Sequence, residues 1–182
     1  MKRLNIKDAL LWKDGLVAGE QILLSGEIYT ARDAAHKRFF ALLDEGKTLP
    51  FDINGAFIYY AGPTPAPEGR AVGSCGPTTS SRMDPYAPAL LDMGMCAMIG
   101  KGDRDDAVYE AIVRNKALYL CAVGGAGALA SMCISSCRVV CFEELGCESV
   151  KKMEICDFPL YVGIDTGGNS IFPKGEAKND HR

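Results

Sequence analysis

Short apolar segments alternate with helix-like segments between residues 73 and 140, and this alternation constrains the fold more than any other feature. Residues 96–99 are predicted to form a strand, residues 103–115 a helix, and residues 118–123 another strand. A glycine turn at residues 124–127 then leads into an Ala-rich helix. Strands that alternate with helices are typical of α/β domains, so we expect at least part of the sheet to be parallel.

The N-terminal third predicts a more mixed β portion. Residues 21–26 read as a strand that ends at its glycine, and a helix is expected directly afterwards, with Thr30 as its N-cap and Gly46 as its stop. Further along, Asp84 is expected to cap a short helix, because Pro85 suits the first helical position.

The chain has 182 residues, which fits one domain with a buried core. Two further strands are expected near residues 154–155 and 161–164. The segment 174–182 is polar and is expected to fray. We therefore predict a single domain over residues 1–173, followed by a polar C-terminal tail.

The charge balance excludes a broad nucleic-acid interface. The chain has 20 Lys and Arg residues against 23 Asp and Glu residues, so its formal net charge is −3. Such a chain lacks the basic field that binds a phosphate backbone. Any anion that this protein binds must therefore be held by a few well-placed cations.

Residues 117–137 carry no charge and have about the length that crosses a bilayer. Their glycines and serines favour a buried strand, a turn and a buried helix instead, so we expect no membrane association. The N-terminus lacks the apolar run of a signal peptide, which predicts a cytoplasmic protein with reduced thiols.

Eight cysteines are present, yet no pair has the Cys-x-x-Cys spacing of a zinc knuckle. Cys133, Cys137 and Cys141 are spaced four apart, but the residues around Cys141 read better as a strand than as a helix. Core packing is therefore expected for these three side chains, and we predict no metal ligands in this chain.

Three short motifs combine glycine or hydroxyl residues with a cation where a predicted strand ends. Ligands of α/β folds bind at such sheet ends. The cations are Arg32, Arg82 and Lys101. Arginine grips a carboxylate with a bidentate fork and lysine adds a point charge, so the three would bind a small dianion if their loops converge.

Each motif alone has a simpler structural explanation. An arginine in the first turn of a helix, such as Arg32, is usually solvated, and the glycine-flanked motif around Lys101 is commonly only a turn. Thr78 and Thr79 are also typical turn residues, and Asp84 is most simply a helix cap. Sequence alone leaves open whether these residues meet.

Taken together, the motifs resemble a known family. The segments that carry the resemblance are Tyr29-Thr30-Ala31-Arg32-Asp33, Gly76-Pro77-Thr78-Thr79-Ser80-Ser81-Arg82-Met83-Asp84 and Ile99-Gly100-Lys101-Gly102. In this order they resemble the β subunit of the class I iron–sulfur hydro-lyases, which include class I fumarate hydratase and L(+)-tartrate dehydratase. The resemblance covers roughly residues 4–172.

The resemblance implies a fold and a site. The fold would be a swivelling β/β/α domain, α/β in class, with a mixed sheet or barrel-like β core flanked by helices. The residues at the substrate-binding positions are Arg32, Arg82, Lys101 and Thr79. Thr78 would act as the base that takes a proton from carbon, with Asp84 as the second candidate.

The resemblance also implies a partner. A separate α subunit would hold a 4Fe–4S cluster, and this chain, which lacks a cluster-ligand cassette, would be inactive without it. The expected reaction is the reversible hydration or dehydration of a C4 dicarboxylate, fumarate to malate first and tartrate to oxaloacetate next. An α2β2-type assembly is expected, or a homo-oligomer when the chain is isolated. The alternative is a non-catalytic anion-binding or regulatory domain derived from such a subunit.

Overall fold

The computed structural model describes residues 1–173, and the predicted polar tail at residues 174–182 lies outside them. Within the described part, seven strands form one sheet in the order β1-β2-β3-β4-β5-β7-β6. The strands are β1 (Lys2–Asn5), β2 (Gln21–Thr30), β3 (Phe57–Tyr59), β4 (Ala97–Gly100), β5 (Leu118–Cys121), β6 (Ile134–Cys141) and β7 (Val150–Ile164). The two halves of the chain therefore share one sheet.

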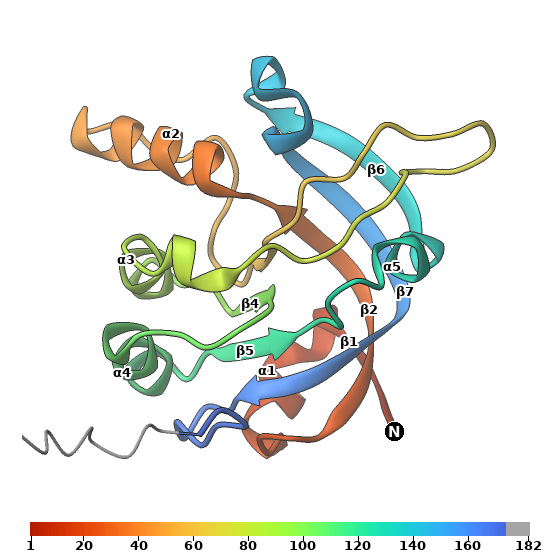
Figure 1. Cartoon of the computed structure of the whole chain (residues 1–182). Helices are drawn as coiled ribbons and strands as arrows, with labels where there is room; N and C mark the ends of the chain where they lie inside the picture. Colours follow the sequence, from red (N-terminus) through yellow and green to blue (C-terminus); the bar gives the residue numbers. More distant parts are fainter. Residues whose placement is uncertain (174–182) are drawn as a thin grey trace, which may run out of the picture.

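The sheet closes on itself because β7 pairs with both β2 and β5. Strands β2, β3, β4 and β5 are parallel to one another, whereas β7 runs antiparallel to both β2 and β5. Five strands of the described chain thus form a barrel-like core, and β1 and β6 extend it (Figure 1). The α/β class that the sequence predicts and the barrel-like core that the resemblance implies are both confirmed.

Strands β3 and β4 are buried on both faces, which explains their continuous apolar sequences. Phe57 and Tyr59 pack in the barrel interior, while the neighbouring Ile58 and Tyr60 pack against the helices. Each of these four side chains is at most 1% exposed. Because burial of one such side chain contributes roughly 1.5–3 kcal/mol, the two-sided packing specifies the strand register.

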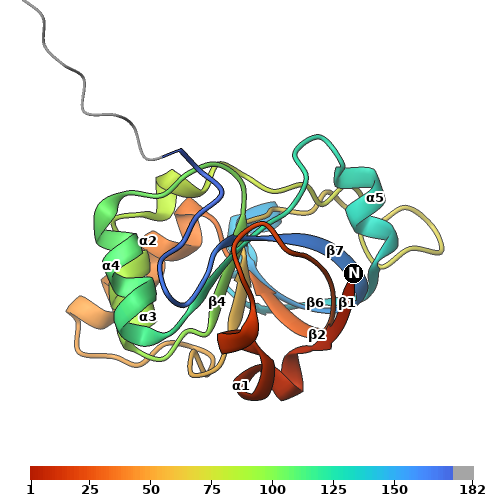
Figure 2. The same ribbon diagram turned by 90° about the horizontal axis from the view of Figure 1, so that it is seen from below.

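Three helices, α2 (Asp33–Asp44), α3 (Ala87–Asp92) and α4 (Asp106–Asn115), lie on one side of the barrel (Figure 1 and Figure 2). In α4, the Asp105 side chain accepts a hydrogen bond from the Val108 amide and caps the first turn. The buried face of α4 belongs to the same apolar cluster as the outer face of the sheet, as its helical periodicity predicts.

The remaining helical segments are short. The α-helices are α1 (Ala9–Trp12) and α5 (Gly127–Met132). The 3-10 segments are η1 (Ile6–Asp8), η2 (Lys13–Gly15), η3 (Ser80–Met83) and η4 (Glu143–Glu148). Of these, η3 and η4 bear on the candidate site, because each carries a charged side chain that pairs with α2 or the residue before it.

The strand predicted over residues 21–26 continues to Thr30. Gly26 has a φ of 125°, which lets the strand bulge there instead of ending. Thr30 is therefore not an N-cap, and that prediction is wrong: its hydroxyl accepts a hydrogen bond from the Lys151 amide, and Arg32 occupies the N-cap position of α2. Pairing with β7 overrides the local capping signal.

Asp84 is likewise not the cap of α3, because Tyr86 occupies that position. The two short strands predicted near residues 154–155 and 161–164 are parts of one strand, β7. Asp157 has a positive φ of 50° inside that strand. This local irregularity lies where the sequence pattern predicts a break, but the strand pairing continues past it.

The uncharged segment 117–137 forms β5, a glycine turn and α5 in the predicted order, and it ends in β6. The prediction that the helix is buried is only partly right, because Leu129 is 66% exposed and Met132 is 72% exposed. Gly127 packs so closely on the loop around Gly76 that a Cβ would lie 2.9 Å from the Gly76 amide nitrogen. In the described part of the chain, no helix combines the length and the apolarity needed to cross a membrane. Cys137 and Cys141 lie on β6, so the cysteine trio forms no helical stripe.

Candidate functional site

The four parallel strands of the barrel end at one edge of the sheet, and the predicted cations follow two of them. Arg32 lies two residues after β2, and Lys101 directly follows β4. Between them, β3 leads into Tyr60. Carboxyl ends of parallel strands are where α/β folds bind ligands. Arg32 and Lys101 therefore lie where a site is expected.

Backbone hydrogen bonds carry the Gly-Pro-Thr-Thr loop, called the threonine loop below, across this edge. The Thr78 amide donates to the Tyr60 carbonyl at 2.7 Å, and the Ser80 amide donates to the Lys101 carbonyl at 2.9 Å. Thr79 pairs with Lys101 in an isolated parallel bridge. Main-chain contacts thus hold the threonine loop beside Lys101.

An ion pair brings Arg82 to the same edge. Its Nε donates to Asp33 Oδ1 at 2.7 Å, and Asp33 begins α2 directly after Arg32. Arg32 Nη2 in turn lies 3.1 Å from Glu148 Oε1 at the end of η4. Gly62 accommodates the Arg32 side chain, because a Cβ there would lie 3.2 Å from Arg32 Cδ. All three predicted cations therefore border one sheet edge.

The charges at this edge are only partly balanced. Arg32 and Arg82 each have an internal carboxylate partner, whereas the Lys101 ammonium has no ion pair among the described residues. In the same part of the chain, Arg32 Nε and Asp33 Oδ2 are buried without a hydrogen-bond partner. Unpaired buried polar atoms are rare in folded proteins and call for an explanation. Three cations against two carboxylates leave a net positive charge that suits an anionic ligand.

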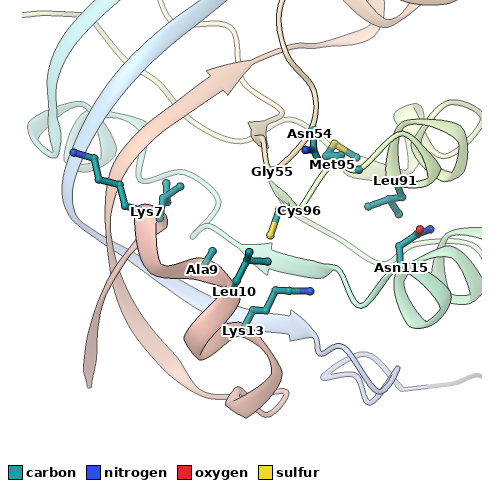
Figure 3. Close-up of a pocket in the computed structure, with 12 residues that line it drawn as sticks. Lys7, Ala9, Leu10, Lys13, Asn54, Gly55, Leu91, Met95, Cys96 and Asn115 are labelled. Atoms are coloured by element: carbon teal, nitrogen blue, oxygen red, sulfur yellow. The ribbon is translucent and has the colours of Figure 1, made fainter.

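A cavity of about 420 Å³ lies at the opposite, amino-terminal ends of the same strands (Figure 3). Its walls include Lys7 and Lys13 near α1, Asn54 before β3 and Cys96 before β4. The predicted site residues do not line this cavity. The candidate site is instead exposed on the isolated chain, where the Arg82 side chain is 51% exposed.

His36 contacts the backbone of this edge at the start of α2. It is fully buried on α2, and its Nδ1 lies 2.8 Å from the Arg32 carbonyl oxygen. Burial lowers the pKa of His36 from its ordinary 6.5 to about 4, so the imidazole is neutral near pH 7. A fully buried imidazole that contacts the Arg32 carbonyl packs the helix and does not serve as a base at the surface.

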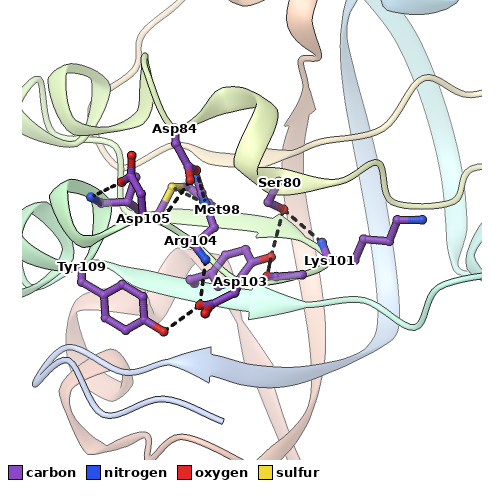
Figure 4. Close-up of polar contacts among 11 residues, drawn as sticks. Ser80, Asp84, Met98, Lys101, Asp103, Arg104, Asp105 and Tyr109 are labelled. Carbon is purple, nitrogen blue, oxygen red and sulfur yellow. Dashed lines mark hydrogen bonds and ion pairs between the residues drawn. The ribbon is translucent and has the colours of Figure 1, made fainter. Parts of the chain in front are cut away.

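Asp84, the second candidate for the base, lies in a buried ion pair (Figure 4). Arg104 Nε donates to its Oδ1 at 2.6 Å, and the Asp105 amide donates to its Oδ2 at 2.9 Å. The Arg104 side chain is 0% exposed and the Asp84 side chain 7% exposed. Because both carboxylate oxygens are engaged, this geometry suits Asp84 to hold loops together more than to accept a proton.

Sequence reasoning missed three residues next to these loops: Ser80, Arg104 and Tyr119. Ser80 stands in a run of hydroxyl residues, and Tyr119 reads as one more apolar strand residue. Arg104 is flanked by Asp103 and Asp105, a pattern typical of a solvated turn. The sequence pattern therefore predicts an exposed Arg104, whereas the structure buries it.

The described residues do not fit an iron–sulfur cluster. Among them, no group of three or more His, Cys, Asp or Glu side chains is close enough to hold a metal ion. The eight cysteines are free, and Cys75 is buried in the core beside the threonine loop. Burial raises the pKa of the Cys75 thiol to about 12, so it is a protonated packing residue near pH 7.

Comparison with known proteins identifies the family. The family described as Fumarase C-terminus matches residues 4–175, which is nearly the whole chain. The chain belongs to this family. The resemblance that the sequence motifs carry is thereby confirmed. Fumarate hydratase class I, aerobic, of Escherichia coli is 41% identical over 154 residues, which are 84% of this chain and 28% of that protein.

Two further relatives are similar to most of this chain. Fumarate hydratase 2 of Leishmania major is 39% identical over 158 residues, 86% of this chain and 28% of that protein. The putative L(+)-tartrate dehydratase subunit beta of Methanocaldococcus jannaschii is 36% identical over 169 residues, 90% of this chain and 87% of that protein. The chain thus spans less than a third of these fumarate hydratases and most of the tartrate dehydratase subunit.

Proposed function

We propose that this member of the Fumarase C-terminus family is the β subunit of a hydro-lyase that hydrates or dehydrates a C4 dicarboxylate. The observation that carries the proposal is the convergence of three cations and the threonine loop at one sheet edge. Arg82 reaches the start of α2 through Asp33, directly beside Arg32. Main-chain hydrogen bonds join the threonine loop to Lys101.

The cations hold the two substrate carboxylates. Arg32 and Arg82 bind them with guanidinium forks, Lys101 adds its ammonium, and the Thr79 hydroxyl adds one hydrogen bond. Each guanidinium has five N–H donors, so an internal carboxylate on one side leaves donors for the substrate. A dianion would therefore bind without breaking the ion pairs that orient the arginines.

Thr78 takes the proton from the carbon beside a carboxylate. A threonine hydroxyl is a weak base near pH 7, so nearby cations must stabilise its alkoxide or the proton must pass to a better acceptor. The main-chain contacts between the threonine loop and Lys101 support this arrangement, because they hold the backbone of a cationic residue beside the loop that carries Thr78.

The proposal assigns a 4Fe–4S cluster to a partner α subunit. Two observations support it: the described residues offer no cluster ligands, and the chain matches 87% of a protein named as a beta subunit but 28% of fumarate hydratases. The exposed edge then forms a seam with the partner, and two such units form an α2β2-type assembly. The free cysteines support a reducing compartment such as the cytoplasm.

Fumarate is the favoured substrate, with tartrate next. Both reactions present two carboxylates to the same cations, and malate differs from tartrate by one hydroxyl, which a few pocket residues distinguish. The relatives named fumarate hydratase are 34–41% identical to this chain, a range that includes the 36% of the tartrate dehydratase subunit, so identity does not decide between them. Fumarate is placed first because no feature of the sequence marks tartrate.

Arg82→Ala tests the proposal in the complex reconstituted with its α subunit. Arg38→Ala is the matched control, because both arginines are 51% exposed and pair with one carboxylate, Asp33 at 2.7 Å or Glu144 at 2.6 Å. We expect Arg82→Ala to lower kcat/KM for fumarate about 100-fold, since a charged hydrogen bond is lost, and Arg38→Ala to change it less than about twofold. Anaerobic fumarate–malate conversion measures both.

Three outcomes would contradict parts of the proposal. Turnover by the isolated chain would refute the need for a partner. Equal activity of the Arg82→Ala and Arg38→Ala complexes would refute the site and favour a non-catalytic anion-binding or regulatory domain. Faster conversion of tartrate than of fumarate by the unmodified complex would reverse the order of substrates.

A further inference from the structure

A buried polar layer borders the threonine loop and the turn at Lys101 (Figure 4). Its members are Ser80 of η3, Tyr119 of β5 and Arg104, which precedes α4. Ser80 and Tyr119 are 0% exposed, and Arg104 is 5% exposed. The proposed function uses none of these side chains, although they contact the backbone of the residues that it uses.

Ser80 holds the Lys101 peptide at two points. Its amide donates to the Lys101 carbonyl at 2.9 Å, and its Oγ accepts a hydrogen bond from the Lys101 amide at 3.0 Å. Gly100 makes this approach possible, because a Cβ at that position would collide with Ser80 Oγ. The Ser80 side chain therefore determines where Lys101 lies relative to the threonine loop.

Tyr119 holds Ser80 in turn. Its hydroxyl is hydrogen-bonded to Ser80 Oγ at 2.9 Å and to the Gly102 carbonyl oxygen at 2.8 Å. The turn is thus held on both sides of Lys101, at its own amide through Ser80 and at the next carbonyl through Tyr119. Burial raises the pKa of Tyr119, so its hydroxyl remains protonated and available for both contacts.

Arg104 restrains the Tyr119 ring. Its guanidinium carbon lies 5.0 Å from the Tyr119 ring centroid and 5.4 Å from that of Tyr60, which is the geometry of a cation–π contact. The same guanidinium pairs with Asp84, two residues after Arg82. The buried Arg104 therefore connects Tyr119 of the sheet with the segment that carries Arg82, a proposed substrate-binding residue.

We propose that Tyr119 is a positioning residue: through Ser80 it sets the placement of Lys101 relative to Thr78. The inference rests on the proposed function, because a reacting substrate is what makes this placement matter. Misplacement of reacting groups by about 1 Å can cost about 100-fold in rate. Tyr119 is fully buried, so it acts through Ser80 and not on the substrate.

The test compares Tyr119→Phe, Ser80→Ala and the double variant in the reconstituted complex. Tyr59→Phe is the matched control, because it also removes a buried hydroxyl that donates to a carbonyl, that of Cys75 at 2.7 Å. We expect Tyr119→Phe and Ser80→Ala each to lower kcat about tenfold while KM for fumarate changes less than about twofold. The double variant is expected to lose less kcat than the product of the two single losses, because the two changes share the Tyr119–Ser80 contact although each also removes one contact of its own.

The control separates positioning from stability. Tyr59→Phe is expected to lower the melting temperature as much as Tyr119→Phe does, because each loses a buried hydrogen bond, yet to change kcat less than about twofold. Equal losses of kcat in Tyr59→Phe and Tyr119→Phe would overturn the proposal. If the two single losses of kcat multiplied fully in the double variant, Tyr119 would not act through Ser80, and the proposal would be overturned as well.

A second readout needs no activity. Hydrogen–deuterium exchange at the Lys101 amide of the isolated chain is expected to be about tenfold faster in Tyr119→Phe and Ser80→Ala than in Tyr59→Phe. Unchanged exchange would overturn the positioning role. A wild-type complex without turnover would overturn the proposed function instead, and the exchange rates would still show whether Tyr119 holds the turn.

Discussion

The two ends of the parallel strands β3, β4 and β5 carry different kinds of surface. The amino-terminal end has the cavity of about 420 Å³ beside α1. The carboxyl-terminal end has three cations and the threonine loop on an exposed edge. The hollow and the concentration of charged side chains therefore lie at opposite ends of the same strands.

The cations at the two ends also differ in what they contact. At the amino-terminal end, Lys7 is exposed, and the buried Lys13 donates its ammonium hydrogen to the Lys116 carbonyl. At the carboxyl-terminal end, Ser80 holds the backbone of Lys101, whose ammonium has no ion pair in the part of the chain that the structure describes. The proposed site therefore depends on charged side chains with unused donors, whereas the cavity at the other end offers volume without such a set of charges.

The largest expected effect compares one Asp–Arg pair from each end. Asp84→Asn leaves the buried Arg104 without its counter-charge, so we expect the free energy of unfolding to fall by about 3–5 kcal/mol. Asp92→Asn removes the exposed partner of Arg114, and we expect a much smaller loss because water screens that pair. Urea unfolding followed by circular dichroism measures both. Similar losses in the two variants would break the distinction between the ends.

The next effect concerns two adjacent threonines at the carboxyl-terminal end. Thr78 is half-buried and Thr79 is exposed. We expect Thr78→Val to lower kcat of the reconstituted complex about 1000-fold, because it removes the proposed base, and Thr79→Val to lower kcat/KM about tenfold through one lost hydrogen bond. Steady-state kinetics with fumarate provides the measurement. A larger loss of kcat in Thr79→Val than in Thr78→Val would show that the proposal assigns the proton transfer to the wrong threonine.

The smallest of these effects is a pH dependence of stability that arises at the carboxyl-terminal end. The unfolded chain protonates His36 below about pH 6.5, whereas the folded chain keeps it neutral down to about pH 4. Stability therefore falls as the pH decreases between these values. The pKa difference corresponds to a loss of about 3 kcal/mol, at 1.36 kcal/mol per unit.

His36→Gln isolates this contribution. Urea unfolding of the wild type and of His36→Gln at pH 7 and pH 4 gives two pH dependences, and their difference belongs to the imidazole. We expect the variant to lose less stability than the wild type on acidification, because glutamine does not titrate. Equal losses would show that groups other than His36 account for the whole pH dependence between pH 7 and pH 4.

The sequence predicted the fold class and the positions of the cations, because both follow from local patterns. Apolar runs such as residues 97–100 identify strands that are buried on both faces, and Lys101 stands directly after one of them. Arg32 follows the end of β2 in the same way. Since parallel strands end at a common edge, a local pattern was enough to bring these two cations to one edge.

The sequence misjudged residues whose role depends on distant partners. Thr30 has the composition of a helix cap, but β7 pairs with it and extends the strand. Asp84 also has the composition of a cap and instead neutralises Arg104. In both cases a local preference worth about 1 kcal/mol was outweighed by tertiary contacts.

The sequence by itself determined most of the strands and helices and which charged residues stand at the strand ends, because these depend on periodicity over a few neighbours. Only the tertiary structure decided that β7 closes the barrel, which joins Lys151 to Thr30 across 121 positions, and that Arg104 and Tyr119 lie buried beneath the loops. The physical reason is that desolvation and hydrogen bonding depend on which groups meet in space, and no short stretch of sequence specifies its distant partner.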